Sequence, residues 1–283
     1  MNRVVHAGGF LLVVALLGCS DQGIQAEGST DSPSSEHRSS SKVAIPNSKD
    51  REGIRATQSA DYVADEYPGG AFIVSDFGSP PAGDAIDAIR KLEAAAKAGN
   101  SKASYEIYLK LNQCLNVLKD SRAQQTLPSD ADTVKNCESL GPDDYAKASE
   151  WLSLAAEQGS LGAQLLYASD PEAIVGDASE MLRNPGAVDE YKERSNSYLR
   201  KAASQGSVDA LSALGDTYMN GIMAPQDLPT SYAYFLTMKR IDPQLLSRRK
   251  LEFFENTLTA SQIAEANRKS MEIYNECCRK KAR

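Results

Sequence analysis

The sequence predicts an all-α protein, an α-solenoid in which antiparallel helix pairs stack on one another behind a disordered N-terminal tether. Two observations support this fold class. A signature occurs three times, in which a pair of alanines is followed by a turn glycine and then by a further alanine. Apolar residues accompany each copy at the spacing that places them on one face of a helix. A unit repeated in this way indicates an array of helix pairs rather than a single globule.

The three copies identify the residues that we expect to pack between helices. Small side chains let antiparallel helices approach closely, glycine supplies the turn, and each pair leaves an apolar face that the next pair covers. An aromatic residue recurs in register at Trp151, Tyr198 and Tyr234, where we expect core packing. The predicted repeat-packing residues are Ala95, Ala96, Gly99 and Ala103, then Trp151, Ala155, Ala156, Gly159 and Ala163, then Ala202, Ala203, Gly206, Ala210, Gly215, Tyr218 and Gly221.

Residues 1–18 have the pattern of an export signal. Arg3 precedes an apolar run that is too short to span a membrane, which takes about 20 residues. The run ends in the letters LLGC, whose last residue is Cys19, and this resembles the lipobox of bacterial lipoproteins. The resemblance implies cleavage before Cys19 and lipidation of its thiol, and several acyl chains give stable anchoring. An ordinary cleaved signal followed by an incidental cysteine is the alternative.

Residues 19–60 are polar and rich in serine, and they lack apolar periodicity. Such a segment cannot bury enough surface to offset its chain entropy, so we expect a disordered tether. Residues 61–81 form an extended lead-in. Within it, residues 71–74 could pair as a short strand or cover the first helix.

The helical domain is expected over residues 82–283. Its helices follow from apolar spacing and from start and stop signals such as Asp170-Pro171 and the capping box of Thr259 and Gln262. The main predicted helices cover residues 84–98, 101–118, 145–158, 160–168, 188–204, 208–220, 228–241 and 243–256, with a last helix from residue 259.

The second and third units resemble the Sel-one-like repeat (SLR) family, a relative of the tetratricopeptide repeats. The family unit is similar to D-x-x-x-A-x-x-W-x-x-x-A-A-x-x-G-x-x-x-A-x-x-x-L-G-x-x-Y-x-x-G, and it is matched between Asp144 and Ala163 and between Ala202 and Gly221. The units here are spaced more widely than in the family, so insertions must form loops or extra helices. The resemblance implies a right-handed superhelix whose concave face binds peptides or proteins.

Four cysteines follow Cys19, and an oxidising compartment would favour disulfides. Three pairings are possible. We favour the pairing of Cys114 with Cys137, because closing this loop would stabilise the folded state by about 3 kcal/mol in the entropy model. Cys277 and Cys278 would point about 100° apart on one helix, so a bond between them would be strained, and we expect one buried and one free thiol. The sequence contains no C-x-x-C pair, which is the spacing that would indicate a zinc site.

Composition excludes several classes of function. The net charge of −7 argues against a nucleic-acid partner, because such proteins carry clustered basic residues. The two histidines, His6 and His37, precede the helical domain, which therefore lacks the commonest general base and metal ligand. We expect no cofactor and no metal site.

The sequence as a whole predicts a non-enzymatic interaction module. We expect a lipid-anchored protein of the bacterial cell envelope, in the outer membrane and facing the periplasm, that binds an extracytoplasmic protein or peptide. The alternative is a cell-wall-directed small-ligand binder or hydrolase of β-lactams or muropeptides, since cysteine-rich secreted relatives in the family are associated with such activity.

Overall fold

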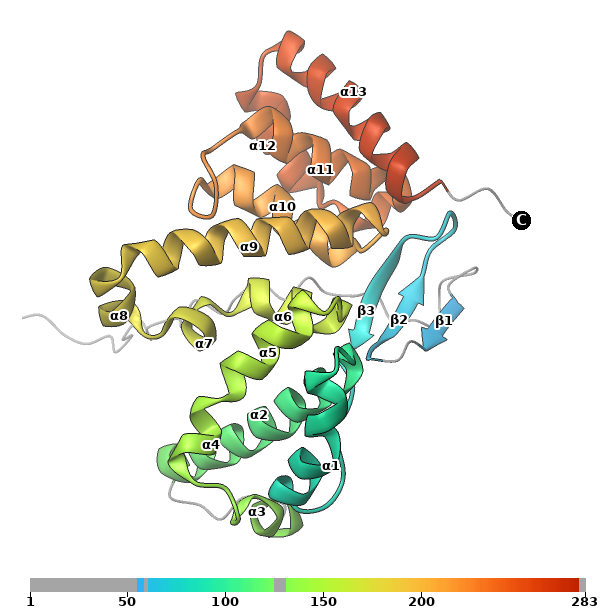
Figure 1. Cartoon of the computed structure of the whole chain (residues 1–283). Helices are drawn as coiled ribbons and strands as arrows, with labels where there is room; N and C mark the ends of the chain where they lie inside the picture. Colours follow the sequence, from blue (N-terminus) through green and yellow to red (C-terminus); the bar gives the residue numbers. More distant parts are fainter. Residues whose placement is uncertain (1–54, 59–60, 125–130, 280–283) are drawn as a thin grey trace, which may run out of the picture. The chain divides into compact units, whose positions relative to one another are not determined.

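The computed structural model describes residues 55–58, 61–124 and 131–279. Helices dominate this part of the chain, and three short strands precede them (Figure 1). The predicted signal at 1–18, Cys19 and most of the predicted tether lie outside the described residues.

Helix pairs follow one another along the chain. Each helix of the series α1, α2, α5, α6, α9, α10, α11 and α13 packs against the next, so the helices form a continuous array. The pairs are α1 (Ala85–Lys97) with α2 (Ser101–Gln124), α5 (Ala148–Glu157) with α6 (Leu161–Ser169), α9 (Pro185–Ser204) with α10 (Val208–Asn220), and α11 (Leu228–Ile241) with α13 (Ala260–Cys277).

The same helix-to-helix turn occurs three times, at the three predicted turn glycines. Gly99, Gly159 and Gly206 have φ values of 98°, 97° and 101°, in the left-handed region that favours glycine. In each turn the residue after the glycine donates its N–H to the first alanine of the pair, and its side chain caps the next helix. The bonds run from Asn100 N to Ala95 O (3.0 Å), from Ser160 N to Ala155 O (3.0 Å) and from Ser207 N to Ala202 O (3.1 Å).

Shorter helices occupy the insertions between the pairs. Two of the predicted helices are broken. The helix expected over 145–158 is interrupted at Lys147. The helix expected over 243–256 begins as a 3-10 turn, after which Leu246 is buried and Ser247 caps a new helix. The inserted elements are α3 (Ala131–Cys137), α4 (Pro142–Ala146), α7 (Pro171–Val175), α8 (Ala178–Arg183), η2 (Pro243–Leu245) and α12 (Arg248–Thr257).

A three-stranded antiparallel sheet precedes the helices. Its strands β1 (Arg55–Gln58), β2 (Val63–Glu66) and β3 (Phe72–Asp76) pair in chain order. The chain is therefore not purely helical. The lead-in 61–81 contains a hairpin, and β1 falls inside the segment 19–60 that we expected to be disordered. A four-residue polar strand such as β1 has little signal of its own and depends on its pairing with β2.

The hairpin is fixed to the third helix pair by its backbone. Phe72 donates its N–H to the carbonyl of Gly206 (2.9 Å), and Val74 donates to Oδ2 of Asp209 (2.9 Å). For residues 71–74 we expected either a short strand or a cover on the first helix. Residues 72–74 pair with β2, and the segment lies on the α9–α10 turn rather than on the first helix.

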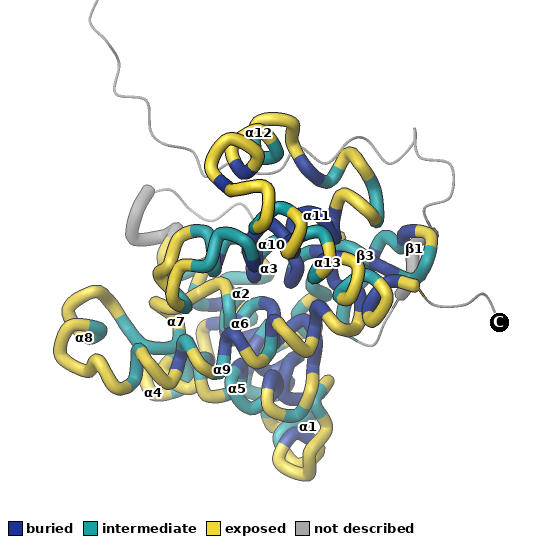
Figure 2. The backbone as a smooth tube through the Cα atoms, turned by 90° about the horizontal axis from the view of Figure 1, so that it is seen from above, coloured by how far each residue is buried: buried dark blue, intermediate teal, exposed yellow. Residues whose placement is uncertain are grey.

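Buried residues lie along the contacts of the array, while α8 is almost wholly exposed (Figure 2). The largest apolar cluster is built by the hairpin, by α6 and by the helices from α9 to α13. Gly215 is required there because a Cβ atom at this position would lie 2.6 Å from the ring of Phe235. In residues 55–58, 61–124 and 131–279, no helix is long and apolar enough to cross a membrane.

Candidate functional site

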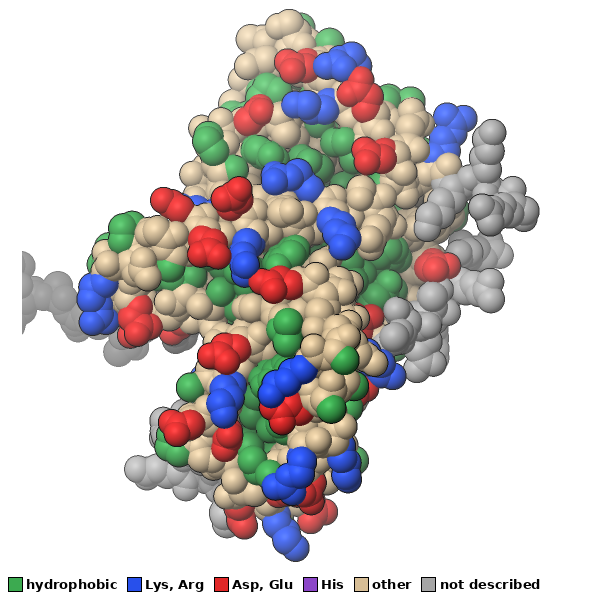
Figure 3. Space-filling view, in the orientation of Figure 1, with side chains coloured by type: hydrophobic (Ala, Val, Ile, Leu, Met, Phe, Trp, Pro, Cys, Tyr) green, Lys and Arg blue, Asp and Glu red, His purple; other side chains and the backbone are tan. Residues whose placement is uncertain are grey.

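A pocket of about 220 Å³ lies between α1 and α5 and is called here the α1–α5 pocket. Its position follows from the array, because α1 and α5 both pack on α2 and leave a gap above it. In Figure 3, hydrophobic side chains gather between charged ones over the region of α1, α2 and α5. The pocket is lined by Ile86, Ile89, Arg90, Glu93, Leu111, Asp144, Lys147 and Trp151.

The apolar part of the α1–α5 pocket comes from three helices. Ile86 and Ile89 are half-buried and stand three residues apart on α1, so they share one face. Leu111 of α2 is only 1% exposed, and Trp151 of α5 is half-buried against two core clusters. The pocket therefore offers an aromatic and aliphatic surface that is held by the core.

The break between α4 and α5 supplies part of the charged rim. Pro142 starts α4, and Oδ2 of Asp144 accepts a hydrogen bond from the backbone N–H of Gly141 (3.0 Å), which caps the helix. Lys147 lies at the junction of the two helices, and its Nζ is 3.6 Å from Oδ1 of Asp144. The start of α4 at Pro142 and its end before Lys147 thus place Lys147 beside the pocket.

Charges of both signs complete the rim on α1. Glu93 accepts from Nζ of Lys97 at 2.6 Å, and Arg90 is 3.2 Å from Asp87. The bond to Lys97, and to a smaller extent the charge of Lys147, lowers the pKa of Glu93. Glu93 therefore forms its ion pair with Lys97, and the positive charge of Lys147 lies near enough to favour the ionised carboxylate.

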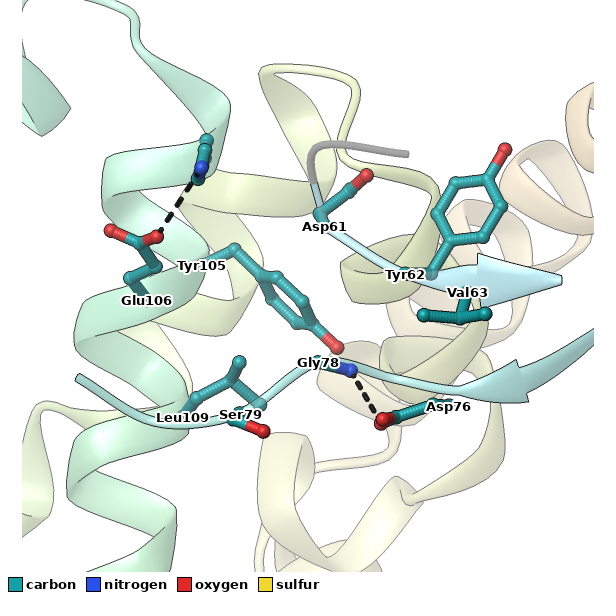
Figure 4. A pocket seen from close by; sticks show the side chains of 10 residues that line it. Asp61, Tyr62, Val63, Asp76, Gly78, Ser79, Tyr105, Glu106 and Leu109 are labelled. Atoms are coloured by element: carbon teal, nitrogen blue, oxygen red, sulfur yellow. Dashed lines mark hydrogen bonds and ion pairs between the residues drawn. The ribbon is translucent and has the colours of Figure 1, made fainter. Parts of the chain in front are cut away.

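A second pocket, of about 260 Å³, lies between the β2–β3 hairpin and the first half of α2 (Figure 4). Its walls combine polar and apolar side chains. Gly78 donates its N–H to Asp76 (2.9 Å), and Lys102 pairs with Glu106 (3.7 Å). It is lined by Asp61, Tyr62, Val63, Asp76, Gly78, Ser79, Lys102, Tyr105, Glu106 and Leu109.

Tyr105 ties this second pocket to the core. Its hydroxyl donates to the carbonyl of Phe77 (2.7 Å), its side chain is 1% exposed, and burial raises its pKa. A Cβ atom on Gly162 of α6 would lie 2.9 Å from that hydroxyl. Tyr105 therefore joins α2 to the segment that follows β3 and packs closely against α6.

Within the described part of the chain, no group of three or more His, Cys, Asp or Glu side chains is placed to hold a metal ion. Both pockets are also smaller than the roughly 300–1,000 Å³ of ordinary small-molecule sites. The α1–α5 pocket has the size and the apolar lining for a side chain of a bound polypeptide.

The predicted repeat-packing residues hold the array together and, apart from Trp151, do not line this pocket. Ala95 is exposed, because α1 is the first helix of the described array and no earlier helix covers it. Gly99, Gly159 and Gly221 are also exposed, but they keep their roles as turn residues with positive φ. The buried members are Ala96, Ala103, Ala155, Ala156, Ala163, Ala202, Ala203, Gly206, Ala210 and Gly215.

The recurring aromatic position is half-buried in every unit rather than fully in the core. Trp151 borders the α1–α5 pocket, Tyr198 meets Tyr167 edge to face (5.3 Å), and Tyr234 stacks on Tyr218 (6.0 Å). Sequence reasoning placed these rings correctly in register but did not find that Trp151 faces a pocket. The available sequence signal was Lys147, a charged residue four positions before Trp151 and so on the same side of a helix, which indicates that this side is not fully buried.

The cysteines form two disulfides in the described chain. Cys114 and Cys137 are bonded, with Cα atoms 5.5 Å apart, which is the pairing that the sequence favours. Cys277 and Cys278 are also bonded to each other, so our expectation of a free thiol is wrong. The reason is that Cys278 has left the helix, with φ −131° and ψ 12°, and the 100° separation of successive helical side chains does not apply.

The sequence matches no protein-family model, and no curated protein matches it significantly. A similar solved structure is the crystal structure of c5321, a protective antigen present in uropathogenic Escherichia coli strains that displays an SLR fold. The two share 20% identity with a TM-score of 0.38, over 68% of this chain and 42% of that one. The present chain thus spans less than half the length of c5321.

The geometry itself defines the class of protein. Helix pairs joined by one repeated turn, each packed on the next, make the described chain a helical-repeat protein. The α1–α5 pocket combines packing residues of this array, Trp151 and Leu111, with exposed side chains such as Arg90 and Lys147.

Proposed function

We propose that this chain is an interaction module of the bacterial cell envelope, lipid-anchored at Cys19 in the outer membrane and facing the periplasm, and that it binds an extracytoplasmic protein through the α1–α5 pocket. The observation that carries the proposal is the pocket itself. An aromatic and aliphatic surface stands open there between two helices of the array.

The lining of the pocket supports a polypeptide ligand. Binding energy in protein interfaces concentrates in aromatic and aliphatic anchors that fill preformed pockets, with polar groups around them. Trp151 and Leu111 are held by the core and so need little reordering on binding, whereas Arg90 and Lys147 are exposed at the rim. This is the arrangement expected for one anchoring side chain of a partner.

The anchor is supported by the motif around Cys19 and by the polar segment that follows it. A lipidated cysteine joined to the helical domain by a polar chain would hold the domain near a membrane without embedding it. Ser20, rather than aspartate, follows Cys19, which favours the outer membrane.

Site-specific photocrosslinking in the native bacterium tests the proposal. A photoreactive phenylalanine analogue replaces Ile89 or Lys147 in the full-length chain, and Lys239 on α11 serves as an exposed control position. We expect a light-dependent adduct with a discrete envelope protein at the two pocket positions and not at the control. The same adduct should be lost when Trp151→Ala is added, with helical content checked by circular dichroism.

The absence of an adduct at both pocket positions would contradict the proposal. Hydrolysis of a chromogenic β-lactam or of muropeptides by the purified full-length chain would then favour the alternative, a cell-wall-directed enzyme or small-ligand binder.

A further inference from the structure

The repeat allows one junction of the array to be compared with the next. Lys147 and Arg194 each precede the alanine pair of their own helix by eight residues, so they are equivalent positions. Lys97 and Glu157 each directly follow an alanine pair, so they are also equivalent. The α1–α5 junction and the α5–α9 junction can therefore be read position by position.

At the α5–α9 junction, the chain supplies a carboxylate across the gap. Arg194 of α9 lies 2.9 Å from Glu157 of α5, and it also lies 3.3 Å from Glu190 on its own helix. One cation thus faces two carboxylates, one along the helix and one across the junction.

At the α1–α5 junction, the carboxylate across the gap is replaced by a cation. Lys147 has a nearby partner in Asp144 of α4, but the position equivalent to Glu157 is Lys97. Glu93 is the nearby acid on α1, and it is already paired with Lys97 at 2.6 Å. The remaining rim cation, Arg90, is paired along α1 with Asp87.

We infer that the partner of the α1–α5 pocket is a polypeptide segment in which a bulky apolar residue is followed or preceded closely by Asp or Glu. The apolar side chain enters between Ile89 and Trp151, and the carboxylate side chain takes the place beside Lys147 that Glu157 occupies beside Arg194. This inference rests on the proposed function, since it names the chemistry of the partner that the pocket binds.

The charge of the whole chain helps to distinguish a local site from long-range attraction. The net charge is −7, so the long-range field of the protein attracts basic peptides and repels acidic ones. A preference for acidic residues would therefore have to come from a local site. Lys147 is such a site, because its Nζ lies 3.6 Å from Asp144 and, unlike Arg194, it has no ion pair across its junction among the described residues.

A peptide selection tests the inference directly. Random heptapeptides displayed on phage, with their C-termini fused to the coat protein so that no terminal carboxylate is free, are selected on the full-length chain. We expect the selected sequences to be enriched in Asp or Glu within three positions of a bulky apolar residue. On a Lys147→Glu variant, this acidic enrichment should disappear or change to Lys and Arg.

Lys239→Glu provides the matched control, because it makes the same change in charge on α11, away from the pocket. It should select the same peptides as the unaltered chain. A selected peptide, labelled and titrated, should bind the Lys147→Glu variant about tenfold more weakly than it binds the unaltered chain. Its binding to the unaltered chain should weaken in high salt.

Three results would overturn the inference. The unaltered chain could select peptides without acidic enrichment, the Lys147→Glu variant could select the same sequences, or no peptide could be selected at all. If crosslinked adducts form at the pocket while any of these holds, the proposed function stands and only the chemistry of the partner is wrong. If no adduct forms, both fail.

Discussion

Arg194 of α9 lies 2.9 Å from Glu157 of α5, so an ion pair links the third helix pair to the second. At the preceding junction, the position equivalent to Glu157 is Lys97, and the α1–α5 pocket lies between Ile89 and Trp151. The two junctions of the array therefore differ in the charge at equivalent positions, Glu157 in one and Lys97 in the other.

The Arg194–Glu157 pair should contribute little to stability. Its side chains are 40% and 45% exposed, and exposed pairs contribute about 0.2–1 kcal/mol. A double-mutant cycle with Arg194→Gln and Glu157→Gln, followed by urea denaturation, should give a coupling energy in that range. A coupling of several kcal/mol would show that the pair fixes the geometry of the junction.

Gly206→Ala should destabilise the protein more than Gly99→Ala. Both glycines have positive φ, which costs an alanine about 1 kcal/mol. A Cβ atom on Gly206 would also lie 2.8 Å from the carbonyl oxygen of Gly70, whereas one on Gly99 would meet no atom within 4 Å. Urea denaturation of the two variants separates the backbone cost from the clash, and equal losses would mean that the hairpin does not rest on the turn.

Asp209 should tolerate asparagine but not alanine. Its Oδ2 accepts the N–H of Val74, and an unpaired N–H there costs about 1–3 kcal/mol. Desolvation raises the pKa of Asp209 in the folded state above its ordinary value of 3.8. Between the unfolded-state pKa and the folded-state pKa, the folded state therefore binds more protons than the unfolded state, and the stability falls as pH rises. We expect Asp209→Ala to lower the unfolding free energy and Asp209→Asn to preserve or raise it at neutral pH.

Denaturation at about pH 4 and about pH 7 checks the sign for Asp209. The contribution of this carboxyl to stability should be greater at the lower pH, and the difference should vanish in Asp209→Asn. If both variants lose the same stability at neutral pH, the hydrogen bond to Val74 does not hold the hairpin.

The two disulfides should differ in their effect on stability. Cys114–Cys137 spans 23 positions of sequence, which corresponds to about 3 kcal/mol in the entropy model, whereas Cys277–Cys278 links neighbours and closes almost no loop. Replacing Cys114 and Cys137 by serine should therefore lower the unfolding free energy far more than replacing Cys277 and Cys278. Equal losses would indicate that packing of these buried sulfurs, rather than loop closure, dominates.

Cys19→Ser should release the protein from membranes. The proposed anchor needs the thiol, and without acyl chains a polar segment has no affinity for the bilayer. Fractionation of the native bacterium, with detection in the membrane and soluble fractions, measures the change. Retention of the serine variant in the membrane fraction would contradict the lipid anchor.

The features that the sequence alone determined are local. The turns at Gly99, Gly159 and Gly206, the cap at Asp170 and the capping box at Thr259 each depend on residues within about six positions of one another. Such interactions form wherever the local sequence allows them, and repetition of one such unit is sufficient to indicate an array. The pairing of Cys114 with Cys137 could be favoured because the number of cysteines limits the choices.

Only the tertiary structure decided how distant segments meet. The hairpin on Gly206 and the pocket between Ile89 and Trp151 join residues more than sixty positions apart, and their formation depends on the packing of whole helices. The Cys277–Cys278 bond depended on where α13 ends, which is the least predictable feature of a helix. Periodicity shows which face of a helix is buried, but whether two faces leave a gap is decided by the side chains that meet across it.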